Sequence, residues 1–148
     1  MTGNGIDCSP ALYGSTLLIG SQDFYFYALD AATGEIRWKY EADLGITAAP
    51  AISGGLVIFG CKAGTLHALD IQTGKVIWKM PIGQVITSPP VASGSAIWLQ
   101  AGITFAMNAA DGKILWRAGL GNALHSAPVV TKDAVYLAGM EGEVYALE

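Results

Sequence analysis

The chain has 148 residues, of which 52% are hydrophobic and 14% are charged, and its net charge is −4 at pH 7. This length and composition allow a folded core and exclude an intrinsically disordered chain. The negative balance argues against binding to nucleic acid or to an anionic membrane surface. No apolar run reaches the ~20 residues of a membrane-spanning helix, so we expect no membrane insertion. Residues 1–5 are neither basic nor apolar, and no signal peptide is visible.

Short strands are predicted from the beginning of the chain to its end. Apolar residues alternate with a period of two, and β-branched and aromatic residues are frequent, which is typical of strands rather than helices. The first unit places them at residues 10–12, 17–19, 25–29 and 35–39. The same four recur at 50–52, 57–59, 65–69 and 75–79, and again at 90–91, 97–99, 104–107 and 113–117. A last set occupies residues 128–130, 135–137 and 144–147.

Three residue types repeat with one common period. The spacings are 40 residues and then 38 for Pro50, Pro90 and Pro128, for Trp38, Trp78 and Trp116, and for Gly34, Gly74 and Gly112. Pro10 precedes Pro50 by another 40 residues. Four short strands in a unit of this length predict an all-β propeller of four-stranded antiparallel blades. We expect one domain over residues 1–148, with blades at about 5–42, 43–82, 83–120 and 121–148.

Two kinds of turn separate the predicted strands. Asp30 and Asp70 begin one kind, with Asn108 in the third unit, and a glycine that can adopt positive φ ends each of them. These acidic residues are interpreted as turn caps rather than catalytic groups. The other kind has glycine in the later units but Phe24 in the first. We therefore expect the first turn of that kind to be longer or of another type.

The string Ala-x-Asp-x-x-Thr-Gly-x-x-x-Trp stands at residues 28–38 and 68–78, and a variant of it stands at 106–116. It resembles the tryptophan-docking repeat of the quinoprotein (PQQ-like) β-propellers, and the resemblance covers essentially the whole chain. It implies that Trp38, Trp78 and Trp116 pack between neighbouring blades. The position of Trp98 outside the motif predicts an ordinary core strand residue.

The resemblance also implies a ring of seven or eight blades, whereas this sequence supplies three complete blades and one that lacks its outer strand. We expect half of an eight-bladed ring or part of a larger propeller. A half-ring would expose two apolar blade faces, which are unfavourable in water. A homodimer could close the ring, the chain could close tightly on itself as four blades, or it could belong to a longer protein.

Quinoprotein dehydrogenases carry PQQ, usually with calcium, and many have two adjacent cysteines over the cofactor. Here Cys8 and Cys61 are far apart in sequence, and no acidic calcium-binding cluster stands out. The two cysteines could pair across adjacent blades or remain free thiols. We predict a non-catalytic binding or scaffold module for protein partners or small ligands, without a cofactor. The alternative is a segment or degenerate relative of a PQQ-dependent dehydrogenase. The resemblance favours a periplasmic or extracellular location.

One set of polar residues occupies the same position in every unit, three residues before the proline. Its members are Asp7, Thr47, Thr87 and His125. In a propeller this position faces the mouth of the central channel, so the set is a candidate binding ring. The alternative is a row of solvated loop ends with no ligand. His67, aligned with Tyr27, Phe105 and Tyr145, is predicted to be a strand residue.

Overall fold

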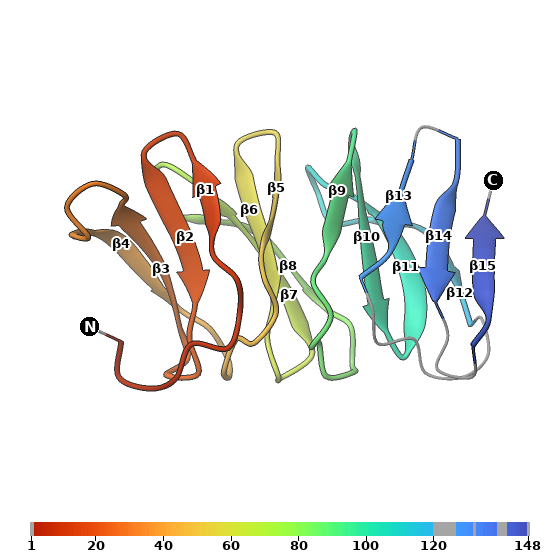
Figure 1. The fold of residues 1–148 in the computed structure, drawn as a ribbon, viewed down its shortest axis with the longest axis horizontal. Coiled ribbons are helices and arrows are strands. Elements are labelled where there is room, and N and C mark those ends of the chain that lie inside the picture. Colours follow the sequence, from red (N-terminus) through yellow and green to blue (C-terminus); the bar gives the residue numbers. More distant parts are fainter. Residues whose placement is uncertain (1, 120–126, 132, 139–141, 148) are drawn as a thin grey trace.

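A computed structural model describes residues 2–119, 127–131, 133–138 and 142–147. In these residues fifteen strands form four antiparallel sheets, three with four strands and one with three, which stand side by side in a row (Figure 1). None of the described segments is a helix long and apolar enough to cross a membrane. The predicted all-β fold of four blades is confirmed.

Within every sheet the strands follow their order along the chain. The first sheet contains β1 (Ala11–Tyr13), β2 (Thr16–Gly20), β3 (Tyr25–Asp30) and β4 (Ile36–Glu41). The second contains β5 (Ala51–Ser53), β6 (Leu56–Gly60), β7 (Thr65–Asp70) and β8 (Val76–Pro81). The third contains β9 (Val91–Ser93), β10 (Ala96–Ala101), β11 (Ile103–Asn108) and β12 (Ile114–Ala118). The fourth contains β13 (Val129–Val130), β14 (Val135–Ala138) and β15 (Val144–Leu147).

The short first strands of the sheets lie together on one side of the row. β1, β5, β9 and β13 contact one another in that order, and they stand in front of the later strands in Figure 1. The linkers between sheets run along the lower end in that view. This is the radial arrangement of a propeller, in which the first strand of each blade faces the channel.

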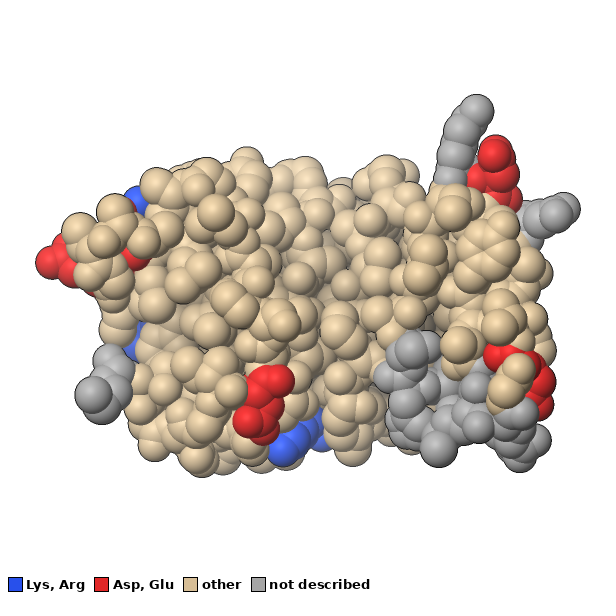
Figure 2. Space-filling view, in the orientation of Figure 1, with Lys and Arg blue, Asp and Glu red and all other residues tan. Residues whose placement is uncertain are grey.

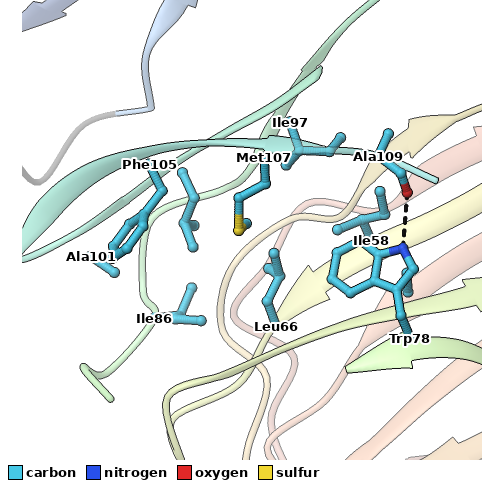
Figure 3. Packing of buried hydrophobic residues seen from close by; sticks show 11 residues of the cluster. Ile58, Leu66, Trp78, Ile86, Ile97, Ala101, Phe105, Met107 and Ala109 are labelled. Atoms are coloured by element: carbon cyan, nitrogen blue, oxygen red, sulfur yellow. Dashed lines mark hydrogen bonds between the residues drawn. The ribbon is translucent and has the colours of Figure 1, made fainter. Parts of the chain in front are cut away.

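Apolar side chains from facing sheets form the core. Between the first and second sheets, Phe26 stacks on Phe59 with ring centroids 4.1 Å apart and an interplanar angle of 8°. Between the second and third, Leu66 and Trp78 pack with Met107 and its neighbours (Figure 3). Because both sides of a middle sheet meet another sheet, residues 57–60 are buried without alternation.

Two of the three motif tryptophans bridge neighbouring sheets. Trp38 Nε1 donates a hydrogen bond to the Ile71 carbonyl oxygen at 2.8 Å, and Trp78 Nε1 donates to that of Ala109 at 2.9 Å (Figure 3). A Cβ added to Gly112, whose φ is +71°, would lie 2.7 Å from the Trp78 ring. The turn glycine is therefore required both for its backbone conformation and for the close approach of the indole.

Trp116 is arranged differently from the other two motif tryptophans. It is 38% exposed, and its ring lies 6.1 Å from that of Trp98, which is half-buried against the fourth sheet. The position equivalent to that docking turn in the fourth unit would come after Leu147, so it is not among the described residues. The expectation that Trp98 is an ordinary core residue is therefore only partly met, because its ring lies beside the exposed Trp116 ring.

The expectation of a longer turn at Phe24 holds against the third unit, where Ala101 pairs with Ile103 across Gly102 alone, but it is wrong against the second unit. Phe24 has φ +76°, close to the +80° of Gly64. The hydrogen bond from Ser21 N to Tyr25 O (3.0 Å) matches the one from Cys61 N to Thr65 O (3.1 Å), so the two turns have the same length. A bulky side chain thus occupies the left-handed region, where β-carbon clashes make it unfavourable.

Candidate functional site

Three of the residues predicted to line the channel mouth are described: Asp7 lies in the segment before β1, and Thr47 and Thr87 lie on the linkers between sheets, which run along the lower end in Figure 1. Asp7 and Thr87 are exposed. Thr47 is half-buried, and its hydroxyl oxygen has no hydrogen-bond partner among the described residues. His125 lies outside the described residues. In the described part of the chain no hydrogen bond joins Asp7, Thr47 and Thr87, so the ring stays a prediction.

Asp7 instead belongs to a polar chain that crosses from the first sheet to the second. Gln22 Nε2 donates a hydrogen bond to Asp7 Oδ2, and Lys62 Nζ donates to Gln22 Oε1 at 3.2 Å. Gln22 and Lys62 occupy the same position in equivalent turns, one before β3 and one before β7. The repeat alignment could have identified both residues, but not that their side chains meet.

Backbone hydrogen bonds hold the linker between the first and second sheets at both sides. Ala42 N donates to Phe24 O (2.8 Å) and Ile46 N donates to Ser21 O (3.0 Å), while Gly45 O accepts from Lys62 N (3.0 Å). The linker is therefore fixed to turns of both sheets. The side chains of residues 43 and 44 start from a rigid backbone rather than from a free loop.

The same end exposes four large apolar side chains. Their exposed fractions are 44% for Ile6, 46% for Phe24, 42% for Leu44 and 58% for Val85. Three lie on linkers or on the segment before β1, and Phe24 lies in the β2–β3 turn. We call these four residues the linker-end surface. Apolar side chains displayed on anchored loops are typical of a protein-binding face.

The channel side of the row is nearly free of charge (Figure 2). Its described strands β1, β5, β9 and β13 contain only apolar, aromatic and serine residues. PQQ is a polycarboxylate that needs cationic partners, and calcium needs carboxylate or carbonyl oxygens. The described residues of this side do not fit that cofactor pair.

A compact polar cluster lies between the first and second sheets. His67 in β7 is fully buried, as is Cys61, which directly follows β6. His67 Nε2 lies 3.5 Å from Cys61 Sγ and 3.6 Å from Asp43 Oδ2. The other ring nitrogen, Nδ1, lies 3.3 Å from Tyr40 Oη. The prediction that His67 is a strand residue is correct, but it missed these partners.

Burial sets the protonation state of this imidazole. It lowers the pKa of His67 to about 4, with a further lowering by the charge of Lys79 and an opposing effect of Asp43. The ring is therefore neutral at neutral pH, with one nitrogen carrying a lone pair. Lys79 Nζ lies 3.7 Å from Asp43 Oδ1, whereas the other carboxylate oxygen, Oδ2, is the one near His67.

The cluster interrupts the repeat. The positions of Cys61 and His67 are held by Ala101 and Phe105 in the third unit, and the position of Asp43 is held by Gly83. This departure from the repeat is visible in the sequence. It does not show that the three residues are close together, because they come from separate elements. Only the packing of two sheets brings them together.

A second concave feature lies between the third and fourth sheets. It is an open cavity of about 630 Å³ lined in part by Trp98, Trp116, Val130 and Val135. Its lining is mixed, because Ser93, Thr131 and Asp133 line it together with the two indoles and the two valines. Trp116 lines this cavity instead of packing fully between two sheets.

The blade architecture, the channel-side first strands and the docking tryptophans define a β-propeller built from PQQ-like repeats. The chain belongs to the family described as outer membrane protein assembly factor BamB, whose repeats match residues 2–81 and 62–148. Of the two alternatives for the cysteines, a disulfide or free thiols, the structure has free thiols, and both Cys8 and Cys61 are buried. A search of the curated proteins finds no match.

Solved structures share this fold. BamB from Moraxella catarrhalis is 25% identical, with a TM-score of 0.86 over 97% of this chain and 50% of that chain. The computationally designed Ika4 protein is 18% identical, with a TM-score of 0.85 over 99% of this chain and 92% of that chain. Quinohemoprotein alcohol dehydrogenase from Comamonas testosteroni is 18% identical, with a TM-score of 0.80 over 90% of this chain and 29% of that chain. The chain thus spans about half the length of BamB.

Proposed function

We propose that this chain is a non-catalytic propeller module that binds a protein partner through the linker-end surface. The observation that carries the proposal is the exposure of Ile6, Phe24, Leu44 and Val85 on loops at one end of the sheets. Exposed apolar patches on soluble proteins often mark binding sites, and we infer that these four side chains contribute to one such patch. The Asp7–Gln22–Lys62 chain, in the segment before β1 and in the turns before β3 and β7, would supply the polar rim that such interfaces carry.

The rigidity of the linker supports the same function. Because residues 42–46 are hydrogen-bonded to turns of two sheets, Leu44 is presented with little conformational entropy left to lose. The family description, an assembly factor for outer membrane proteins, fits a module that holds other proteins. It also fits a location outside the cytoplasm.

A double substitution, Leu44→Asp with Val85→Asp, tests this binding face. The wild-type chain is used to capture partners from an extract of its source cells, and each captured protein is then purified and titrated. We expect the double variant to lose about tenfold or more in affinity for that partner, as when central apolar contacts are removed. Equal affinity of the variant would reject this surface as the binding face.

Ile77→Asp is the matched control. Ile77 is 51% exposed, but it lies on β8, away from the linkers. This control should bind the partner like wild type and should have the same circular dichroism spectrum. The non-catalytic part of the proposal has its own test, in which the chain is given PQQ, calcium and alcohol or sugar substrates with an electron-accepting dye. Dye reduction above background would contradict it.

We also propose that a second copy completes the ring, since the first sheet has an open docking turn. A Cβ on Gly34 would meet nothing within 4 Å, whereas Gly74 lies against Trp38. A partner blade can therefore approach the first sheet. Further blades of a longer chain would fill the same place, and the mass in solution distinguishes the two cases.

A further inference from the structure

We propose that Asp43, Cys61 and His67 form a binding site for a zinc-type divalent cation, with one coordination position open to solvent. The site lies where the linker after β4 meets the second sheet. Each residue offers one ligand atom, and the three atoms lie within 4.8 Å of one another. This function is independent of partner binding at the linker-end surface.

Two of the three distances between the ligand atoms match those of a tetrahedral site. Zinc bonds of about 2.0 Å to nitrogen or oxygen and about 2.3 Å to sulfur place two ligand atoms about 3.3–3.6 Å apart. Cys61 Sγ and Asp43 Oδ2 lie 3.5 and 3.6 Å from His67 Nε2. The third pair, Cys61 and Asp43, lies within 4.8 Å, and the exposed Asp43 side chain is free to rotate so that all three atoms bind one cation.

Hydrogen bonding alone does not account for this convergence. A neutral Nε2 either accepts one hydrogen bond from the Cys61 thiol or donates one to the Asp43 carboxylate. The distance to Asp43 is longer than a good hydrogen bond, and both groups nevertheless face the same nitrogen. A cation bound to all three atoms satisfies them together.

The surroundings of His67 orient its ring for this role. Phe59 stacks on the imidazole at 5.2 Å and 11°, and Tyr40 packs against it edge-on at 5.6 Å. A proton on Nδ1, donated to Tyr40 Oη, leaves the Nε2 lone pair facing Cys61 and Asp43. Metal-binding histidines commonly use the second nitrogen in this way.

The chemistry of the ligands selects the kind of cation. Thiolate and imidazole favour zinc or cobalt over calcium or magnesium, which prefer oxygen ligands. Binding releases the Cys61 thiol proton to solvent, because the thiolate is the ligand. The Asp43 side chain is 45% exposed, so the fourth position is on the solvent side. Lys79 Nζ lies 3.7 Å from the other carboxylate oxygen, Oδ1.

The repeat itself shows that the fold does not require these residues. The third unit builds the same sheet with Ala101, Phe105 and Gly83 at the equivalent positions. The substitutions Cys61→Ala, His67→Phe and Asp43→Gly therefore replace each ligand by a residue that this repeat already accommodates. They are designed to remove the site while keeping the blade.

Cobalt(II) titration of the full chain tests the proposal. We expect one cobalt per chain, a thiolate-to-cobalt charge-transfer band in the near ultraviolet, and loss of the band when zinc is added. The band should vanish in Cys61→Ala and His67→Phe. It should persist in Cys8→Ala, which removes the other buried cysteine. Absence of the band in wild type, or its persistence in Cys61→Ala, would overturn the site.

Two milder variants decide the question if the core substitutions fail to fold. Asp43→Gly changes an exposed linker residue, and zinc should then raise the melting temperature of wild type but not of this variant. Tyr40→Phe should keep the cobalt band and weaken zinc binding by about 10–100-fold, as expected for a positioning residue. An equal zinc effect on the melting temperatures of wild type and Asp43→Gly would reject the site.

Discussion

At the scale of single residues, the indole of Trp78 combines two contributions to stability. It is 9% exposed between two sheets, and its Nε1 hydrogen bond satisfies the Ala109 carbonyl oxygen. Removing the ring leaves a cavity and an unpaired carbonyl group together. Trp116 is a natural comparison, because it has the same motif position but is 38% exposed.

Trp78→Ala should lower the free energy of unfolding by about 3–5 kcal/mol, the usual range for a buried aromatic residue. Trp116→Ala should cost clearly less, since part of its surface is already in water. Urea unfolding followed by circular dichroism measures both. Equal losses in the two variants would show that the docking contact at Ala109 does not matter.

Three hydrogen-bond donors, with Arg37 foremost, control the ionisation of Asp30. Arg37 Nη2 donates to Asp30 Oδ2 at 2.6 Å, and the backbone N–H groups of Ala32 and Thr33 donate to Oδ1. The Arg37 hydrogen bond, followed by these two, lowers the Asp30 pKa to about 2. The folded pKa is below the unfolded value of 3.8, so the stabilising effect holds above about pH 4 and is lost as pH falls toward 2.

Arg37→Met should raise the Asp30 pKa toward 3.8, without reaching it, because the two backbone donors remain. Carboxyl carbon NMR titration measures this shift. The pKa of Asp70, lowered chiefly by Thr73, should not change and serves as the control. An unchanged Asp30 pKa would mean that the backbone donors alone set it.

At the scale of elements, the strands were predictable because each repeat carries the same period-two pattern and the same turn residues. The left-handed backbone conformation of Phe24 was not predictable, because the surroundings of a residue can impose a turn conformation that glycine adopts freely. Asp23 stabilises this conformation by accepting hydrogen bonds from Tyr25 N and Tyr27 Oη. The Asp43–Cys61–His67 cluster was equally hidden, since it depends on the packing of two sheets.

The Phe24 turn gives a prediction in the stabilising direction. A non-glycine residue in the left-handed region costs about 1–2 kcal/mol. The extra freedom that glycine has in the unfolded chain offsets roughly 0.5–1 kcal/mol of that. Phe24→Gly should therefore stabilise the fold by up to about 1 kcal/mol in urea unfolding, and it should weaken partner binding at the linker-end surface. A loss of stability would show that the exposed ring supports the fold.

At the scale of the whole molecule, the two ends of the row differ. On the outward side of the first sheet Ile19 and Tyr27 are buried together with Cys8, so this face is less exposed than the sequence predicts. On the fourth sheet Tyr136 is 42% exposed and Val144 73% exposed. They alternate with Val135 and Leu137, which are buried against the third sheet. One end of the row is thus an open apolar sheet face.

Self-association would cover that face, because apolar area buried from water contributes roughly 25 cal/mol per Å². Two chains related by a two-fold axis would place the fourth sheet of each beside the first sheet of the other, giving a closed ring of eight. Light scattering at micromolar concentration should then give about 31 kDa, twice the 15.4 kDa of one chain. Val144→Asp should shift the mass to 15.4 kDa, while Ile77→Asp on β8 should leave the dimer intact. A compact wild-type species of 15.4 kDa would reject the dimer, because the open face would then be stable in water.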